Sequence, residues 1–450
     1  MMSKVKVPGP PKSHFIFGNL SDFQKNPPEY ILNTAKKYGN ISAIDLAGFL
    51  CVIVNEPEVI KDIMMTNQKQ FVKAHAFRIF KKLLGEGLLT SEGEFHKRQK
   101  RLAQPAFFKQ RIHSYGPGMV DYINRTQTSW KDGETIDLHT QMTDLTLGVV
   151  TKTLFNTEVG TAESRALAES ITAALEIFDE VLASPFADFI LKIPFLPITM
   201  RLKKAIKKLD KILYQIIDEH RTHGGDQGDF ISMMMLAKDE EGTGSMSNKQ
   251  IRDEAITIFL AGHETTANAL CWTFYLLAKN PDKRKKFLAE IDSVLGGKKP
   301  TVEDVPKLTY TLMVFSEALR MYPPVWWTGR ENLEEYTIGD YKFKKGTIFV
   351  ISQYAMHHDE RFYSDPYTFR PERWLPEEAD ARPKFAFFPF GAGIRMCIGN
   401  QFAEQEAILA LASLSQDWLL HIEEEKQVLS TMLTLRPKDG MKVKLERRKK

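Results

Sequence analysis

The chain has 450 residues, of which 43% are hydrophobic and 26% charged, and its formal net charge of +4 at pH 7 is too small to indicate a nucleic-acid-binding protein. Three cysteines without a Cys-x-x-Cys pair argue against a disulfide framework and favour a reducing compartment. Because no Gly/Ser-rich linker, low-complexity tract or internal repeat divides the sequence, we predict a single domain that spans residues 1–450.

The N-terminal segment, Met1 to Pro11, lacks the apolar run of a signal peptide or a membrane anchor. The longest apolar stretches, Ala255 to Leu260 and Ala269 to Ala278, are too short to cross a bilayer. We therefore predict no membrane span and a cytoplasmic protein.

Most of the chain has the apolar spacing of helices, and two regions have strand character. The first is Ile41 to Leu46 with Leu50 to Val54, and the second is Tyr336 to Phe343 followed by Thr347 to Ser352. This pattern predicts a mainly α fold with a small β-sheet region at one edge. A basic amphipathic helix is predicted from Met200 to Arg221. A solvated charged face is the favoured interpretation of that helix, and a membrane-surface or calmodulin-like target is the alternative.

A long helix is predicted from about Asn248 to Lys279, with one continuous apolar face. Gly262, Thr265 and Thr266 in its middle are poor helix formers. A buried threonine can also bond back to the carbonyl four residues earlier, which loosens the helix and leaves room for a small ligand. Taken alone, the segment is equally well explained as a core helix with a tolerated glycine and a stray acid, Glu264.

A shorter helix is predicted from Lys307 to Met321, where Pro323 and Pro324 stop it. Glu317 and Arg320 share one face of this helix because they are three residues apart. Taken alone, the two residues would form an exposed ion pair that contributes little to stability.

The run from Phe390 to Gly399 places Cys397 in a glycine-rich turn just ahead of an apolar-periodic helix. Glycines let the backbone curl and approach a flat ligand. Free amides at the start of a helix, and its positive end, favour an anionic sulfur. Taken alone, Cys397 would be an inert buried cysteine.

Together these segments resemble the cytochrome P450 superfamily, from about Pro8 to Arg447. The haem-ligand signature of that superfamily is filled at every defined position, by Phe390, Gly393, Arg395, Cys397 and Gly399. The resemblance implies a cytochrome P450 fold in which Cys397 binds the iron of haem b (iron protoporphyrin IX).

The resemblance also implies roles for other residues. In the oxygen-activation motif, which begins at Ala261, Glu264 and Thr265 would deliver protons to bound dioxygen. Many members carry tryptophan and arginine where this chain has His96 and Lys100. The residues that match cofactor-binding positions are His96, Lys100, Ala261, Arg330, Phe390, Arg395 and Cys397.

A structural network is implied for Glu317 and Arg320 together with Arg373, which in the family is buried and locks the haem-ligand region to the core. His357 and His358 match no such position, and we expect them to be ordinary histidines.

The segment Pro323 to Trp327 matches the part of the family that lines the cavity over the haem. Adjacent tryptophans in an extended segment must point opposite ways, so we expect one ring in the core. We expect Val325, Trp326 and Leu433 to border the substrate.

The implied reaction is the insertion of one oxygen atom from O2 into an apolar organic substrate, a lipid or a secondary metabolite. The sequence has no dinucleotide fingerprint and no fused flavin or iron–sulfur module. Electrons from NAD(P)H are therefore expected through a separate ferredoxin or flavodoxin with its reductase. The cations that could steer an acidic donor are Lys97, Arg98, Arg101 and Lys109. The alternatives are radical coupling or desaturation at the same haem, and a non-catalytic haem sensor or carrier.

Overall fold

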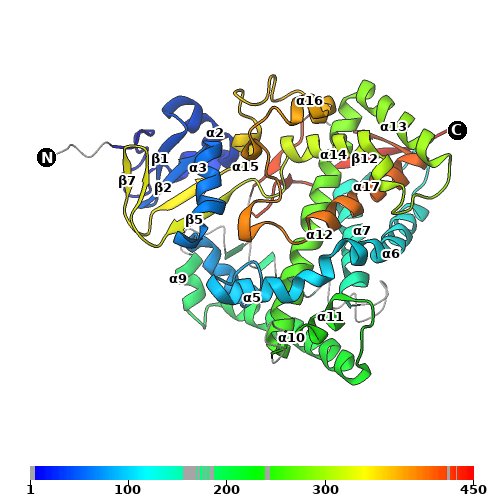
Figure 1. The fold of residues 1–450 in the computed structure, drawn as a ribbon, viewed down its shortest axis with the longest axis horizontal. Coiled ribbons are helices and arrows are strands. Elements are labelled where there is room, and N and C mark those ends of the chain that lie inside the picture. Colours follow the sequence, from blue (N-terminus) through cyan, green and yellow to red (C-terminus); the bar gives the residue numbers. More distant parts are fainter. Residues whose placement is uncertain are drawn as a thin grey trace.

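A computed structural model describes residues 6–155, 187–238, 244–422, 426–431 and 433–449, with the shorter stretches 170, 173–174, 176–177 and 180–181. Residues 1–5 of the N-terminal segment considered above lie outside this range. Figure 1 shows a sheet-containing part near the N-terminus and a larger helical part that extends to the C-terminus. The predicted mainly α fold with a small sheet at one edge is thus confirmed.

The helical part is built around α12 (Asn248–Lys279), which has the predicted bounds. Ser247 and Gln250 form a capping box that satisfies the first free amides of this helix. The main helices that pack against α12 are α7 (Leu138–Phe155), α10 (Pro197–His223), α11 (Phe230–Leu236), α13 (Pro281–Leu295), α14 (Thr309–Met321) and α17 (Asn400–Asp417), and the short α4 (Lys81–Leu84) also contacts it.

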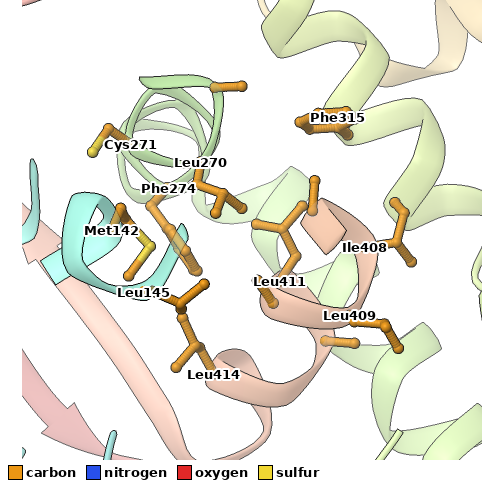
Figure 2. Close-up of a cluster of buried hydrophobic side chains, with 14 of the residues drawn as sticks. Met142, Leu145, Leu270, Cys271, Phe274, Phe315, Ile408, Leu409, Leu411 and Leu414 are labelled. Carbon is orange, nitrogen blue, oxygen red and sulfur yellow. The ribbon is translucent and has the colours of Figure 1, made fainter. Parts of the chain in front are cut away.

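Figure 2 shows the core where these helices meet. Leu145 of α7, Phe274 of α12 and Leu414 of α17 gather at one junction, and all three are buried. Full burial of one such side chain stabilises the fold by roughly 1.5–3 kcal/mol. This packing fixes α12 relative to α17, the helix that follows Cys397.

The remaining helices are shorter or more peripheral. They are α1 (Leu20–Lys25), α2 (Pro27–Tyr38), α3 (Pro57–Lys61), α4 (Lys81–Leu84), α5 (Gly93–Ala103), α6 (Lys109–Thr128), α9 (Ala187–Lys192), α15 (Gln353–His357) and α16 (Pro376–Ala379). Among the helices in the described ranges, none combines the length and apolarity needed to cross a membrane.

The largest sheet has the order β1-β2-β8-β5-β3. Its strands are β1 (Ile41–Leu46), β2 (Phe49–Val54), β8 (Ile348–Ile351), β5 (Thr328–Asn332) and β3 (Phe71–Lys73). The hairpin of β6 (Tyr336–Ile338) and β7 (Tyr341–Phe343) forms a sheet of its own. The other sheets join β4 (Thr135–Asp137), β12 (Lys442–Arg447) and β9 (Trp418–Ile422), and β10 (Leu429–Ser430) with β11 (Arg436–Pro437).

A buried ion pair joins α10 to α11. Nδ1 of His220 lies 2.8 Å from the Ile216 carbonyl oxygen, and Nε2 lies 2.9 Å from Oδ2 of Asp229. Both ring nitrogens therefore face acceptors, which favours the imidazolium. Burial lowers the pKa of His220, but its hydrogen bonds to Asp229 and to the Ile216 carbonyl outweigh burial and raise the pKa above 6.5.

We predict a pH-dependent contribution of His220 to stability. A raised folded-state pKa means that the pair stabilises the fold fully below pH 6.5 and that this contribution is lost as pH rises through the folded pKa. His220→Gln should lower the free energy of unfolding at acidic pH by about 3–5 kcal/mol, because it strands a buried carboxylate. Thermal unfolding across pH would measure this loss, with exposed His223→Gln as the control. Parallel stability–pH curves for the parent and His220→Gln would contradict the prediction.

Candidate active site

Cys397 lies in the loop between a short 3-10 turn (Gly393–Arg395) and α17. Its backbone amide donates to the Phe390 carbonyl oxygen at 2.9 Å. Gly393 has a φ of +64°, and a Cβ at that position would lie 2.0 Å from the Met64 carbonyl oxygen. Only glycine fits there, because a side chain would clash with that carbonyl. The glycine therefore allows the loop to pack closely against Met64.

The side chain of Cys397 is accessible to a small ligand although the surrounding loop is closely packed. Burial raises the pKa of the Cys397 thiol, whereas a hydrogen bond from the Gly399 amide and the charge of Lys100 lower it. The last two effects stabilise an anionic sulfur. The two other cysteines, Cys51 and Cys271, are buried in the core.

α12 is helical without a break through its middle, so the predicted loosening of the helix is not seen there. Ala261 is exposed there, although Leu260 and Thr266 beside it are buried. Oγ1 of Thr265 donates to the Ala261 carbonyl oxygen at 2.7 Å, which is the expected bond to the carbonyl four residues earlier. Ile398, the neighbour of Cys397, packs against the same apolar cluster as Leu260. The cysteine loop and the middle of α12 therefore contact the same apolar cluster.

Glu264 is held by a chain of hydrogen bonds that the sequence analysis missed. Oγ1 of Thr434 donates to Oε1 of Glu264 at 2.7 Å and accepts from Nδ2 of Asn268 at 3.1 Å. Oδ1 of Asn268 lies 3.0 Å from Nε2 of His139 at the start of α7. The carboxylate is thus fixed toward the C-terminal turn. The sequence contains only one indication of this chain of hydrogen bonds. Asn268 is four residues after Glu264 and therefore lies on the same face of the helix.

A cluster of cations lies beside the cysteine loop. Lys73 of β3 and Arg330 of β5 are directly paired across the two strands, although like charges in that position repel. Burial and the charge of Arg395 lower the pKa of Lys73 well below its ordinary value, and they lower that of Arg330 to about 10. Burial lowers the pKa of His96 to about 3, and its Nδ1 is buried without a hydrogen-bond partner. The carboxylate bound to Arg395 is that of Glu92.

The balance of positive and negative charge in this cluster tests whether the site fits haem. Three buried or half-buried cations, Lys73, Arg330 and Arg395, lie beside only two carboxylates, Glu92 and Glu254, so the cluster lacks negative charge. The two propionates of haem would supply that charge, and the unpartnered His96 nitrogen could bond to one of them. The residues present therefore fit the group. Lys73 was missed because β3 is too short to be recognised in the sequence.

The structure places Lys100 against the cysteine loop. Its Nζ donates to the carbonyl oxygens of Ile394 at 2.7 Å and Met396 at 3.1 Å. Both carbonyls belong to the cysteine loop and would otherwise lack donors. In this structure Lys100 therefore holds the cysteine loop against α5, and its contact with a propionate stays a prediction.

The predicted buried network is confirmed. Nε and NH2 of Arg320 each donate to Glu317 at 2.9 Å, and Nε of Arg373 donates to Glu317 at 3.2 Å. All three side chains are buried. NH1 of Arg320 donates to the His357 carbonyl oxygen at 2.8 Å, and Nε2 of His357 accepts from the Phe388 amide at 3.1 Å. His357, predicted to be ordinary, therefore links this network to the segment that leads to Cys397.

The assignment of Trp326 to the cavity is wrong. Trp326 is 2% exposed and packs in an apolar cluster with residues of α2 and β2, whereas Val325 is 41% exposed. Ser352 and Tyr354 both donate to the Trp326 carbonyl oxygen, at 2.9 and 3.1 Å, and hold the segment against the sheet. The ring of Trp327 is half-buried. Leu433 is half-buried and packs against the cluster that contains Leu260.

Comparisons with known proteins agree with this geometry. The family model for Cytochrome P450 matches residues 8–445. The chain is 32% identical to Cyclooctat-9-en-7-ol 5-monooxygenase of Streptomyces melanosporofaciens over 410 residues, 91% of this chain and 88% of that protein. It is 32% identical to Pentalenene oxygenase of Streptomyces avermitilis over 407 residues, 89% of this chain and 88% of that protein. The solved haem domain of cytochrome P450DA has a TM-score of 0.89 and 25% identity, covering 99% of this chain and 98% of that one.

Proposed function

The chain belongs to the cytochrome P450 family and is a cytochrome P450 monooxygenase, and we propose that it inserts one oxygen atom from O2 into an apolar, terpene-like secondary metabolite. The observation that carries the proposal is the accessible Cys397 thiol, which lies in a closely fitted loop beside a cluster of buried cations. The substrate class is supported by the names of the two similar oxygenases and by the apolar residues around Ala261.

Haem b is the cofactor in this proposal. Cys397 would bind its iron as a thiolate, and His96, Arg330 and Arg395, together with Lys73, would hold its propionates. When bound, haem supplies the iron centre at which dioxygen is activated, and thiolate donation favours cleavage of the oxygen–oxygen bond. Similarity to named oxygenases argues against the alternative of a non-catalytic haem protein. Radical coupling and desaturation would be recognised from the products.

The proton path begins at Glu264 in this proposal. Its carboxyl group is fixed by Thr434, and Glu264 lies three residues after the exposed Ala261 on α12. The hydroxyl of Thr265 bonds to the Ala261 carbonyl oxygen, and rotation about one side-chain bond would turn that hydroxyl toward a ligand beside Ala261. Thr265 would then receive a proton from Glu264 and hold one at its hydroxyl beside the exposed Ala261. Val325 and Leu433 would help to exclude water.

We predict that Thr265→Ala separates electron consumption from product formation. The variant should still consume NADPH through surrogate redox partners, but product per electron pair should fall by about 10²–10⁴-fold in favour of hydrogen peroxide. Product and peroxide would be measured in the same reaction. Thr265→Ser keeps the hydroxyl and should remain close to the parent protein. Equal coupling in the parent and Thr265→Ala would place the proton path elsewhere.

The electron donor in the proposal is a separate acidic protein, a ferredoxin or a flavodoxin. Lys97, Arg98 and Arg101 lie on α5, and Lys109 begins α6. Because Lys100 of α5 bonds to the carbonyls on either side of Arg395 in the cysteine loop, these cations lie on the helix that contacts that loop. A cationic surface there would steer an acidic donor toward the thiolate side of the site.

We predict that reversing Arg98 and Arg101 together to glutamate slows reduction by ferredoxin. Charge at an interface governs the encounter rate more than the final affinity, so the deficit should shrink as salt rises. Stopped-flow reduction at several ionic strengths would measure it. Lys285→Glu with Lys298→Glu, both exposed and on or beside α13, gives the same change in charge as a control. A deficit independent of salt would indicate a defect in haem binding or folding instead.

A further inference from the structure

The hydrogen bonds that hold Glu264 continue away from the site to His139, the second residue of α7. The two middle members are buried, since Asn268 is 0% exposed and Thr434 is 6% exposed. The two ends, Glu264 and His139, are each half-buried. These four residues form the His139 relay. The proposed proton path uses only its Glu264 end, so the part that continues to His139 has no role in that path.

The protons available to each group set the direction of every bond in the relay. As a carboxylate, Glu264 only accepts, so the single hydroxyl proton of Thr434 is donated to it, at 2.7 Å. Thr434 then accepts from the amide nitrogen of Asn268, at 3.1 Å. The amide oxygen of Asn268 therefore faces His139, whose Nε2 must carry a proton in order to donate across 3.0 Å. Each bond of the relay thus donates toward Glu264.

His139 is fixed at the start of α7 and faces charges from three elements. Its backbone amide donates to Oδ1 of Asp137 at 3.1 Å, which ties the start of α7 to β4. The charged groups that face the imidazole are Asp137 of β4, Arg436 of β11 and Glu264 of α12. Burial lowers the pKa of His139, the bond to Asn268 and the two carboxylates raise it, and Arg436 lowers it. The protonation of His139 is thus linked to the charge of Glu264.

We propose that His139 is a positioning residue for Glu264. Acting through Asn268 and Thr434, it orients the carboxyl group from which Thr265 would receive a proton. The inference rests on the proposed function, in which Glu264 is the first acid of the proton path. Without the Nε2 proton of His139, nothing distinguishes the two ends of the Asn268 amide, and the amide can flip. A flipped amide takes the hydroxyl proton of Thr434 for its own oxygen, and Glu264 loses its donor.

Histidine-selective NMR of the reduced, carbon-monoxide-bound holoprotein tests the relay itself and needs no turnover. The signal of His139 is identified by its loss in His139→Gln. Because coupling between two sites is reciprocal, Glu264→Gln and Thr434→Val should each lower the pKa of His139, by about 0.3 or more. Asp144→Asn removes an exposed carboxylate farther along α7 and should leave that pKa unchanged. The proposal is overturned if Thr434→Val leaves the pKa of His139 as it is in the parent.

The coupling assay described for Thr265→Ala tests what the relay does for the reaction. His139→Ala removes the donor, and product per NADPH should fall by roughly 10-fold, less than in Thr265→Ala because Glu264 itself remains. His139→Gln should stay close to the parent, since a glutamine amide can still donate to the oxygen of Asn268. Exposed His223→Gln is the control and should behave like the parent.

The two measurements distinguish a failure of this inference from a failure of the proposed function. Equal product per NADPH in the parent and His139→Ala would overturn the positioning role alone. The same loss in His139→Gln as in His139→Ala, at unchanged melting temperature, would also overturn it, because donation to Asn268 would then not be what matters. A parent protein that forms no oxygenated product would contradict the proposed function, and with it this role, even where NMR shows the relay.

Discussion

Glu317→Ala should lower the free energy of unfolding by about 3–5 kcal/mol, because it removes the anionic partner of two buried cations. The carboxylate accepts hydrogen bonds from Arg320 and Arg373 and also from the indole of Trp374 at 3.1 Å. Removing it leaves two buried guanidinium groups without their anionic partner. Chemical denaturation of the holoprotein, followed by helix content and by haem absorbance, would measure the loss.

A control is provided by Glu378, whose carboxylate pairs with Arg370 at 2.6 Å but is partly exposed. Glu378→Ala should cost no more than about 1 kcal/mol, because solvent screens the pair and can replace it. Haem should also be lost at lower denaturant in Glu317→Ala, since Arg320 bonds to His357 and His357 receives the Phe388 amide. If both substitutions lowered the free energy of unfolding equally, the buried network would contribute no more to stability than the partly exposed ion pair.

Features that depend on neighbours in sequence could be predicted well. The turn around Cys397 favours glycine at position 393 because the backbone there has a φ of +64°, and this local requirement is visible as a pattern of residues. Glu317 and Arg320 are one helical turn apart, so the contact between them follows from the spacing alone. The bond from Thr265 to the Ala261 carbonyl is local in the same way.

Features that depend on how distant segments meet could not be predicted. Lys73 faces Arg330 only because β3 pairs with β5 in one register, and nothing near Lys73 in the sequence indicates that partner. Alternation led us to expect that Trp326 and Trp327 point opposite ways, and this was wrong, because their ring centroids lie 5.7 Å apart and both rings pack against one apolar cluster. Packing against α2 and β2 decides that Trp326 is the buried one.

The same reason explains why polar contacts near the site were missed. Thr434 reaches Glu264 because the C-terminal turn folds back onto α12, a contact between segments separated by most of the C-terminal half of the chain. Lys100 lies one helical turn after His96, yet the two side chains reach different groups. His96 faces the cations, and Lys100 is close enough to two carbonyls of the cysteine loop to bond to them.

Cys397→Ser should abolish oxygenation, because a serine hydroxyl is a weak oxygen donor and cannot supply the electron density of a thiolate. The loss should not come from unfolding. Cys397 is accessible and its amide bond to the Phe390 carbonyl does not involve the side chain. Cys51→Ala is the matched control, since Cys51 is a buried core residue of β2 and should leave the haem spectrum unchanged.

The most direct test of the thiolate ligand is the absorbance of the reduced, carbon-monoxide-bound protein. The parent and Cys51→Ala should show the red-shifted Soret band of a haem with a thiolate ligand. Cys397→Ser should lose that shift while still folding, as judged by circular dichroism. If Cys397→Ser kept the same red-shifted band, another residue would be the iron ligand, and the assignment of Cys397 would be wrong.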